Sequence, residues 1–186
     1  MQAIPALHLD QYDLNMPYAW WKCGMAERQV LFDAYFRRHP FGNGYTVFAG
    51  LERIVEYIKN LRFGPDDIEY LRSRPERYDE DFLEYLRTFR FCGDIDSVRE
   101  GEIVFPDEPL LKVRGTLFEA AVVEAAILNI INWHSPVATK ASRMKQVAGD
   151  DLLIEMATRR MPEVDAALWA ARAAYIAGFD STSNTE

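Results

Sequence analysis

Residues 152–184 read LLIEMATRRMPEVDAALWAARAAYIAGFDSTSN, and this stretch decides the fold class. A short apolar segment from Leu152 to Met156 is followed by a polar loop, an alanine-rich helical segment from Asp165 to Ile176, and then Gly178-Phe179-Asp180. Strands and helices that alternate in this way usually build a parallel sheet or barrel, with ligand sites at the carboxyl ends of the strands. We therefore predict an α/β protein whose residues 150–186 begin an incomplete α/β barrel.

The residues before this stretch follow other patterns. Apolar residues recur every three or four positions over residues 51–61 and again over 82–89, which predicts two helices. Gly64-Pro65 is expected to end the first of them. Apolar and basic residues alternate in Leu111-Lys112-Val113-Arg114, and turn formers precede that run. Residues 93–115 are therefore expected to form short strands.

Helical signals return after these strands. Thr116 and Glu119 form a capping box ahead of the apolar run at residues 120–131, so a long and largely buried helix is expected there. Ser135-Pro136 has the composition of a helix cap and first helical residue, which predicts a further helix that Gly149 closes.

The changes of pattern suggest two domains. The first is expected to span residues 1–149, helical over residues 1–92, with short strands over 93–115 and long helices over 116–149. The second, residues 150–186, is the truncated start of the barrel. The sequence contains no internal repeat, low-complexity tract or Pro/Gly/Ser-rich linker that would mark another boundary.

Charge and composition argue against several classes of partner. The 186 residues include 21 basic and 29 acidic residues, a formal net charge of -8, which would repel a nucleic-acid backbone. The longest apolar runs are interrupted by polar residues, and the N-terminus lacks a basic segment followed by an apolar one. Cys23 and Cys92 are far apart, without the spacing of a zinc site or redox motif. We expect a cytoplasmic protein that binds neither nucleic acid nor membranes.

Two polar clusters follow the predicted strands of the C-terminal stretch. Arg159 and Arg160 offer planar forks of donors that match the oxygens of phosphate and carboxylate. Residues 180–184 carry hydroxyl and amide groups that can hydrogen-bond a small polar ligand. At the carboxyl ends of neighbouring strands both clusters would project towards one face and could bind a phosphate or carboxylate. The alternatives are a solvated arginine pair and a segment that only caps a helix.

Two further candidates lie near the N-terminus. Tyr12 precedes an aromatic run and could stack on a ring-shaped ligand, or it could pack in the core. Arg37 and Arg38 stand before a glycine-containing turn and could contact an anion, or they could line a charged loop edge. The 3 histidines lack metal-ligand spacing, and the sequence contains no phosphate-binding glycine motif. No metal site is expected.

Several stretches, taken in order and at their spacing, resemble the nicotinate phosphoribosyltransferases, which have the type II phosphoribosyltransferase fold. Each stretch is weak by itself, whereas the ordered set covers nearly the whole chain. The stretches are LDQYDLNM (9–16), FRRHPF (36–41), FAGL (48–51), EGEIVFP (100–106), ATKASR (138–143), EMATRR (155–160) and ARAAYIAGFDSTSN (171–184).

The resemblance implies that nicotinate reacts with phosphoribosyl pyrophosphate to give nicotinate mononucleotide and pyrophosphate in NAD biosynthesis. It also implies that ATP, with Mg²⁺, is hydrolysed to ADP and phosphate through a phosphorylated histidine. Family members look like homodimers whose active sites combine both subunits. By this resemblance Tyr12 would stack on the pyridine ring and Arg37 would reach the phosphates, both in the neighbouring subunit's site. Arg159 and Arg160 would lie near the phosphoribosyl and pyrophosphate groups.

The resemblance also assigns the ring pocket. Met156 stands where the family has a stacking phenylalanine, because Glu155-Met156-Ala157 replaces the usual Glu-Phe-Gly. Methionine is apolar but more flexible than phenylalanine. Ser183 stands where related nicotinamide-using enzymes have an aspartate. Because a carboxylate there would repel the carboxylate of nicotinate, Ser183 favours the acid as substrate.

The end of the chain departs from the family pattern. Family members are considerably longer, and the phosphorylated histidine of their Gly-Thr-x-Ala-His-Ser stretch would lie beyond Glu186. No catalytic residue of that kind is therefore expected within this chain. Two interpretations follow: the N-terminal part of an enzyme that is inactive by itself, or a non-catalytic remnant that binds only a ligand or a partner chain.

Overall fold

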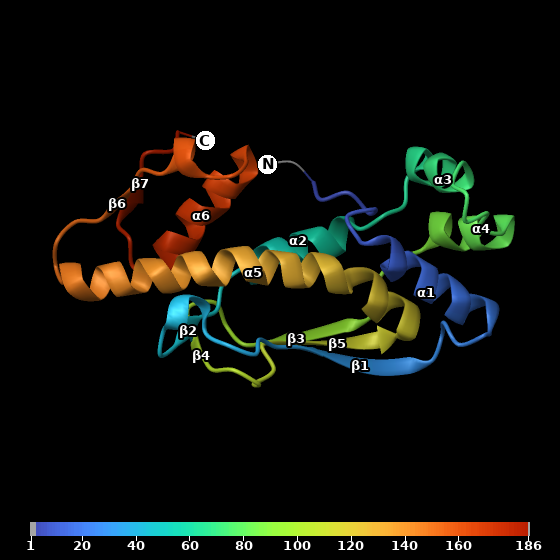
Figure 1. The fold of residues 1–186 in the computed structure, drawn as a ribbon, viewed down its shortest axis with the longest axis horizontal. Coiled ribbons are helices and arrows are strands. Elements are labelled where there is room, and N and C mark those ends of the chain that lie inside the picture. Colours follow the sequence, from blue (N-terminus) through green and yellow to red (C-terminus); the bar gives the residue numbers. More distant parts are fainter. Residues whose placement is uncertain (1–2, 186) are drawn as a thin grey trace.

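The computed structural model describes residues 3–185. One long helix, α5 (Leu117–Ala148), runs through the middle of the molecule, with a small antiparallel sheet on one side and α2 and α6 on the other (Figure 1). The other elements, in chain order, are α1 (Gln11–Lys22), β1 (Gln29–Ala34), η1 (Pro40–Gly42), β2 (Thr46–Val47), α2 (Leu51–Asn60), α3 (Pro65–Arg72), α4 (Glu80–Thr88), β3 (Asp94–Ser97), β4 (Ile103–Val104), β5 (Leu111–Thr116), β6 (Ile154–Glu155), η2 (Thr158–Arg160), α6 (Val164–Ile176) and β7 (Ser181–Thr182).

Helix α5 begins and ends where the sequence signals predict. Thr116 Oγ1 accepts a hydrogen bond from the Glu119 amide at 3.2 Å, and Glu119 Oε2 accepts one from the Thr116 amide at 2.8 Å. These two bonds satisfy donors that a helix N-terminus leaves without partners. Gly149 ends the helix with a φ of 59°, a conformation that glycine adopts without steric cost.

The prediction of a second helix beginning at Ser135-Pro136 is wrong, because α5 continues through Pro136 for a total of 32 residues. Ser135 is buried inside the helix, where its Oγ accepts from the Ala49 amide and donates to the Ala49 carbonyl, both at 3.1 Å. Thr139 Oγ1 likewise accepts from the Val47 amide at 2.9 Å. These contacts with the segment around β2 favour a continuous helix despite the amide hydrogen that proline lacks.

The predicted strands within residues 93–115 are confirmed as β3, β4 and most of β5. The main sheet has the order β1-β5-β3 and is antiparallel, with Gln29 of β1 opposite Thr116 of β5. The prediction that residues 1–92 are helical is wrong at β1 and β2. In β1 every second residue is partly buried against the core, but Leu31 points outward between Val30 and Phe32, so the apolar run shows no period of two.

The helices predicted over residues 51–61 and 82–89 are confirmed as α2 and α4. Gly64-Pro65 does not directly end α2, which stops at Asn60. It begins another helix, α3, in which Pro65 occupies the first turn and the Gly64 amide donates to Asp67 Oδ2 at 2.8 Å. Proline suits this position because its missing N–H would be unpaired in a first turn anyway.

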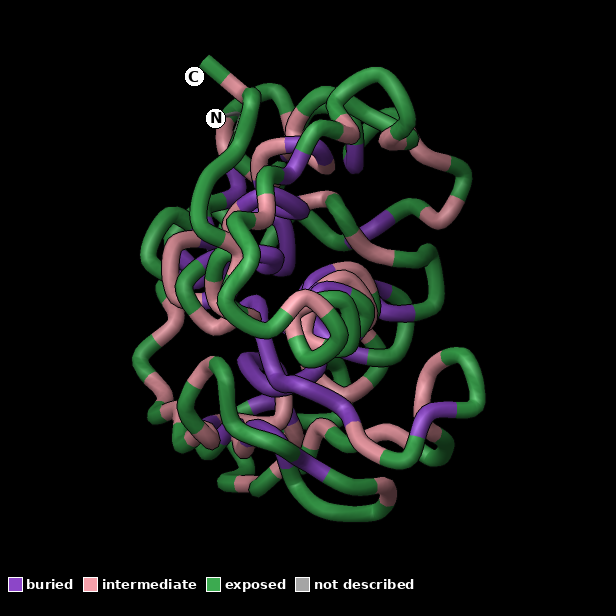
Figure 2. The backbone as a smooth tube through the Cα atoms, turned by 90° about the vertical axis from the view of Figure 1, so that its left-hand side faces the viewer, coloured by how far each residue is buried: buried purple, intermediate pink, exposed green. Residues whose placement is uncertain are grey.

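The main core lies between α5, the three-stranded sheet and the helices of the N-terminal part. Figure 2 shows the buried residues inside the molecule and the exposed ones along its outer loops. The largest fully buried side chains include Phe48, Phe82 and Phe118. Phe118, in the first turn of α5, packs edge-on against Tyr85 at a ring separation of 4.9 Å. The aromatic contacts therefore fix the start of α5 against α4.

The C-terminal stretch forms the predicted strand-helix-strand unit. β6 and β7 are parallel, and α6 connects them and packs on α5. The predicted strand over residues 152–156 is shorter than expected, because only Ile154 and Glu155 pair with β7. The predicted helix over residues 165–176 is confirmed as α6.

Candidate functional site

The carboxyl ends of β6 and β7 lie side by side. Ile154 is opposite Ser181 and Glu155 is opposite Thr182, and the Ser183 amide donates to the Glu155 carbonyl oxygen at 2.8 Å. Because the strands are parallel, the residues that follow each strand leave the pair at the same edge. We call this region, residues 155–160 and 181–184, the β6–β7 edge.

The Glu155 carboxylate organises this edge, and its role was not predicted from the sequence. Glu155 is buried, with an exposed fraction of 8%. Oε1 accepts from the Ala157 amide at 2.6 Å, and Oε2 accepts from Thr182 Oγ1 at 2.8 Å and Asn184 Nδ2 at 3.3 Å. A carboxylate with such a set of donors holds its neighbours in a fixed arrangement. In the sequence, Glu155 is visible only as a glutamate before Met156, and nothing there indicates which residues its carboxylate contacts.

Arg159 and Arg160 lie in η2, directly after β6, and both are exposed. The hydroxyl of Thr158 donates to Asn184 Oδ1, so the arginine-bearing turn is tied to the segment that follows β7. Within residues 3–185 neither guanidinium forms an ion pair. The two polar clusters singled out in the sequence are thus adjacent, and they offer positive charge to an anion at the β6–β7 edge.

A largely apolar cavity of about 660 Å³ lies beside the same edge. It is bounded by α5, by Phe41 of η1 and by Met156, whose side chains are both highly exposed. Lys140 of α5 is the basic residue in its wall. A concave site with an apolar wall and a few polar groups is the usual form of a small-molecule site. Ser183, by contrast, is exposed on the edge itself.

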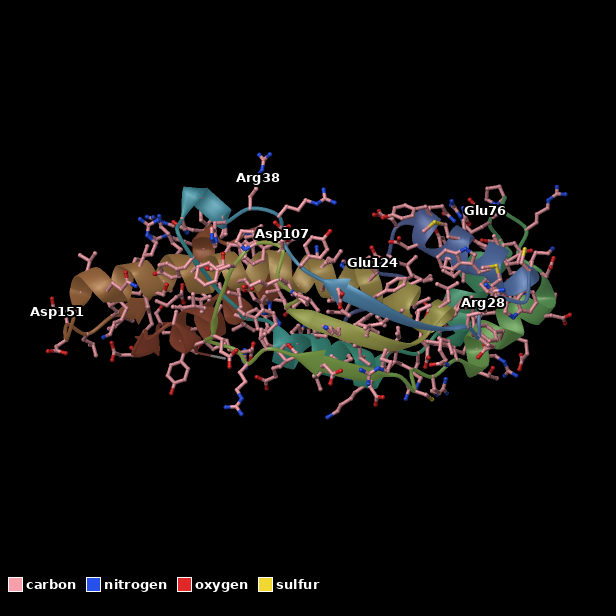
Figure 3. The ribbon with its side chains drawn as sticks, turned by 90° about the horizontal axis from the view of Figure 1, so that it is seen from below. Arg28, Arg38, Glu76, Asp107, Glu124 and Asp151 are labelled. Atoms are coloured by element: carbon pink, nitrogen blue, oxygen red, sulfur yellow. The ribbon has the colours of Figure 1, made fainter. Side chains whose placement is uncertain are left out.

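Tyr12 and Arg37 are not part of this site within the chain. Tyr12 is 57% exposed on α1, at the opposite end of α5 from β6 and β7 (Figure 1). The neighbouring Asp13 carboxylate raises the pKa of Tyr12, so its phenol stays neutral at physiological pH. Arg37 lies exposed between β1 and η1, and the adjacent Arg38 extends away from the body of the molecule (Figure 3). Neither Tyr12 nor Arg37 packs in the core.

Across residues 3–185, no three His, Cys, Asp or Glu side chains gather as a set that could hold a metal ion. In the same part of the chain, no helix is both long enough and apolar enough to cross a membrane.

Comparison with known proteins identifies the family. The family model described as the nicotinate phosphoribosyltransferase (NAPRTase) N-terminal domain matches residues 7–132. The chain belongs to the nicotinate phosphoribosyltransferase family. The stretches that carried the resemblance in the sequence therefore reflect a true relationship.

Individual relatives extend the match to the C-terminal stretch. The chain is 49% identical over 179 residues to nicotinate phosphoribosyltransferase of Bacillus subtilis, covering 96% of this chain and 36% of that protein. It is 40% identical over 184 residues to the Caenorhabditis elegans nicotinate phosphoribosyltransferase, covering 97% of this chain and 33% of the relative. The chain thus spans about a third of the length of these relatives.

Solved structures agree with the sequence comparison. The human nicotinic acid phosphoribosyltransferase superposes with a TM-score of 0.87 at 35% identity, over 95% of this chain and 36% of that structure. A nicotinate-nucleotide pyrophosphorylase from Pyrococcus furiosus superposes with a TM-score of 0.75 at 21% identity, which shows a shared fold. The mixed helix-strand architecture is therefore that of the nicotinate phosphoribosyltransferase N-terminal domain.

Proposed function

We propose that this chain is the N-terminal part of an enzyme that makes nicotinate mononucleotide from nicotinate and phosphoribosyl pyrophosphate in NAD biosynthesis. In this reaction the ring nitrogen of nicotinate forms a bond to C1 of the phosphoribosyl group. The bond from C1 to the pyrophosphate oxygen breaks, and pyrophosphate leaves with the electron pair. Family membership and the cationic β6–β7 edge carry this proposal.

The β6–β7 edge supplies groups suited to the phosphorylated substrate. Arg159 and Arg160 are exposed, and neither forms an ion pair within residues 3–185. Guanidinium groups at the carboxyl end of a strand match the oxygens of phosphoribosyl pyrophosphate, which carries the largest charge of the substrates. We assign these two arginines to the phosphoribosyl and pyrophosphate groups.

The ring of nicotinate would lie nearer to the cavity. Met156 borders that cavity and is 72% exposed, so its side chain is free to pack against a flat ring. Ser183 offers a hydroxyl, which can hydrogen-bond the carboxylate of nicotinate, whereas an aspartate at this position would repel it. We assign Met156 and Ser183 to recognition of nicotinate.

We assign Tyr12 and Arg37 to the active site of the neighbouring subunit in a homodimer. Both are exposed, and Tyr12 belongs to α1, which lies towards the opposite end of α5 from β6 and β7 (Figure 1). An exposed neutral phenol ring can stack on a pyridine ring, and an exposed guanidinium can contact phosphate. A side chain that is exposed and does not line its own chain's edge is available to the site of a neighbouring subunit, which supports this assignment.

The remaining parts of the reaction fall to residues outside this chain. We infer that residues 1–149 form the N-terminal domain and that residues 150–186 begin a barrel, whose further strands would pair with the open edges of β6 and β7. The phosphorylated histidine, and the groups that hold ATP and Mg²⁺, are assigned to the rest of the complete enzyme.

An assay that compares this chain with a complete protein containing it tests the proposal. With nicotinate, phosphoribosyl pyrophosphate and ATP, we expect the complete protein to form nicotinate mononucleotide and residues 1–186 alone to form none. Turnover by the isolated chain would contradict the division of roles. Inactivity of the complete protein would instead favour a remnant that only binds a ligand or a partner chain.

Mixing of variant subunits tests the shared site. Tyr12→Ala and Arg159→Ala each remove one side of every site in a homodimer, so each complete variant is expected to be weakly active. In a mixed dimer, one site receives both wild-type residues, and we expect part of the activity to return after subunit exchange. No recovery would place Tyr12 and Arg159 in the same subunit's site. Tyr12→Phe, which keeps the ring, is the matched control.

A further inference from the structure

Glu100 joins three parts of the molecule. It lies in the connection between β3 and β4, and its Oε1 accepts hydrogen bonds from the Gly50 amide at 2.6 Å and the Leu51 amide at 3.0 Å. These amides belong to the N-terminus of α2, where the donors lack helical partners and the helix dipole favours a negative charge. Glu100 therefore caps α2 from a distant point in the sequence.

Arg172 of α6 binds the same carboxylate. Its Nη1 donates to Glu100 Oε1 at 2.9 Å and its Nη2 donates to Oε2 at 2.7 Å. Arg172 also contacts the carboxylate of Glu52 in α2. The side chains of Arg172 and Glu100 are 29% and 16% exposed, so solvent screens this two-pronged ion pair only partly. The pair connects α6 with the beginning of α2.

The protonation state of Glu100 fits this role. Burial acts to raise the pKa of Glu100, but Arg172 and the Gly50 and Leu51 amides more than offset burial and lower it. The carboxylate is therefore charged at physiological pH. Removing Arg172 would leave that charge in a mostly buried position with only the α2 amides as partners.

Apart from the Arg172 pair, α6 is held mainly by contacts of its N-terminal turns and by small buried side chains. The buried residues of α6 are Ala167, Trp169, Ala170, Ala171, Ala173 and Ala174. Alanine side chains are too small to form deep ridges, and interdigitating ridges are what set the crossing angle between packed helices. The other polar and aromatic contacts lie in the N-terminal half of α6. Trp169 stacks on His134 of α5 at 5.3 Å and lies under Arg53 of α2 at 5.0 Å. Asp165 pairs with Arg53 at 3.9 Å, and the Ala166 carbonyl accepts from Trp133 Nε1 at 3.3 Å.

We propose that Glu100 and Arg172 are positioning residues that hold α6, and with it the β6–β7 edge, in a fixed orientation relative to the N-terminal part. The role in catalysis rests on the proposed function, because only there does the edge act on a substrate. α6 joins β6 to β7, so a rotation of α6 about its anchored N-terminal turns would move both clusters of the edge together. The groups on the edge would keep their mutual distances and lose their alignment with groups elsewhere in the active site.

Kinetics of the complete enzyme test the catalytic consequence. We expect Arg172→Leu to lower kcat about tenfold or more, since small misplacements of reacting groups reduce rates steeply. The KM for nicotinate should change less than about threefold, because Met156 and Ser183, the groups of the edge assigned to nicotinate, move together. Arg172→Lys, which keeps the charge but not the fork, should retain an intermediate kcat. If Arg172→Leu does not fold, the kcat of Arg172→Lys still tests the proposal.

Arg72→Leu is the matched control. Arg72 of α3 also lies between two glutamates, with Nε donating to Glu80 at 2.8 Å and Nη1 donating to Glu69 at 2.6 Å. Its side chain is 43% exposed, and α3 is distant from β6 and β7 (Figure 1). We expect the kcat of this variant to equal that of the wild type. An equal loss in both variants would mean that Arg172 has no particular role, and the proposal would fail.

A distance measurement separates the positioning role from the proposed function. Nitroxide labels on Lys59→Cys in α2 and Tyr175→Cys in α6, both exposed positions, report the orientation of α6 without any substrate. Cys23 and Cys92 are replaced first, so that they do not take the label. Labelled subunits are mixed with an excess of unlabelled ones, so that the measured distance lies within one subunit. We expect Arg172→Leu to shift or broaden the distance distribution and Arg72→Leu to leave it unchanged. An unchanged distribution in Arg172→Leu would overturn the proposal.

The kinetic measurement and the distance measurement test separate claims. If the wild-type complete protein makes no nicotinate mononucleotide, the proposed function fails, and the distance measurement alone decides whether the pair positions α6. If KM rises at constant kcat in Arg172→Leu, the pair acts on substrate binding and is not a positioning device. A fall in kcat together with a changed distance distribution is the result that supports both.

Discussion

At the scale of single residues, the role proposed for Ser183 implies that the charge at this position selects which pyridine the β6–β7 edge accepts. The buried carboxylate of Glu155 lies on the neighbouring strand and is already surrounded by donors from Ala157, Thr182 and Asn184. A second carboxylate at position 183 would add negative charge to a place assigned to an anionic substrate. Nicotinamide, whose amide group is neutral, would tolerate that charge, and its amide could donate a hydrogen bond to the carboxylate.

Ser183→Asp in the complete enzyme should therefore reduce kcat/KM for nicotinate relative to nicotinamide by about tenfold or more, because like charges are placed close together. Steady-state kinetics with both pyridines measure the ratio. Ser181→Asp adds the same charge earlier in β7 and is the control. A ratio that does not change in Ser183→Asp would remove this residue from substrate selection.

His134 should make the stability of the protein depend on pH. Burial, followed by the positive charges of Arg172 and Arg53, lowers its pKa from 6.5 to about 4, against an opposing effect of Glu100. The unfolded state then binds more protons than the folded state between these two values, so stability falls as the pH decreases through this window. The part due to Glu100, whose pKa is also lowered, is lost only below the ordinary pKa of a glutamate.

Between pH 7 and pH 5 we expect the free energy of unfolding to fall by about 2 kcal/mol more in the wild type than in His134→Gln, since each unit of pKa shift corresponds to about 1.4 kcal/mol. Urea denaturation at the two pH values measures the difference. Equal pH dependence in both proteins would show that His134 titrates normally.

At the scale of elements, α5 is the axis on which the sheet, the N-terminal helices and α6 are arranged. Its start is fixed by the reciprocal bonds of Thr116 and Glu119, and Glu119 Oε1 also accepts from the Cys92 amide at 2.6 Å. The N-terminus of α5 therefore also holds the segment between α4 and β3. A change at this cap affects more than one helix.

Thr116→Ala should lower the free energy of unfolding by about 1 kcal/mol, because the Glu119 amide loses its acceptor. Urea denaturation followed by circular dichroism gives this value. Thr88→Ala, at the exposed end of α4, removes a threonine without removing a helix N-cap and should change stability by less than about 0.5 kcal/mol. Equal effects of the two substitutions would mean that the cap contributes nothing specific.

At the scale of the whole molecule, the C-terminal unit presents apolar side chains that nothing in residues 3–185 covers. Strands β6 and β7 form a two-stranded sheet with open edges. Large exposed apolar residues gather around this unit: Leu152, Ile154, Met156, Val164 and Tyr175. Apolar surface and unpaired strand edges of this kind favour association between chains.

Residues 1–186 alone should therefore be oligomeric or poorly soluble, and light scattering should give a mass above that of the 21.5 kDa monomer. A complete protein, in which further elements cover the unit, should show no such concentration-dependent aggregation. A monodisperse monomer of the isolated chain would contradict this expectation.

The sequence determined those features whose signals are local. The helix periods at residues 51–61 and 82–89, the Thr116 cap and the strand-helix-strand pattern after residue 150 all predicted the observed elements, and the ordered stretches gave the family. Only the tertiary structure decided the course of α5 through Pro136, the strand β1, the partners of Glu155 and the Glu100–Arg172 pair. These depend on contacts between residues that are far apart in the chain, where packing and buried hydrogen bonds override local preference.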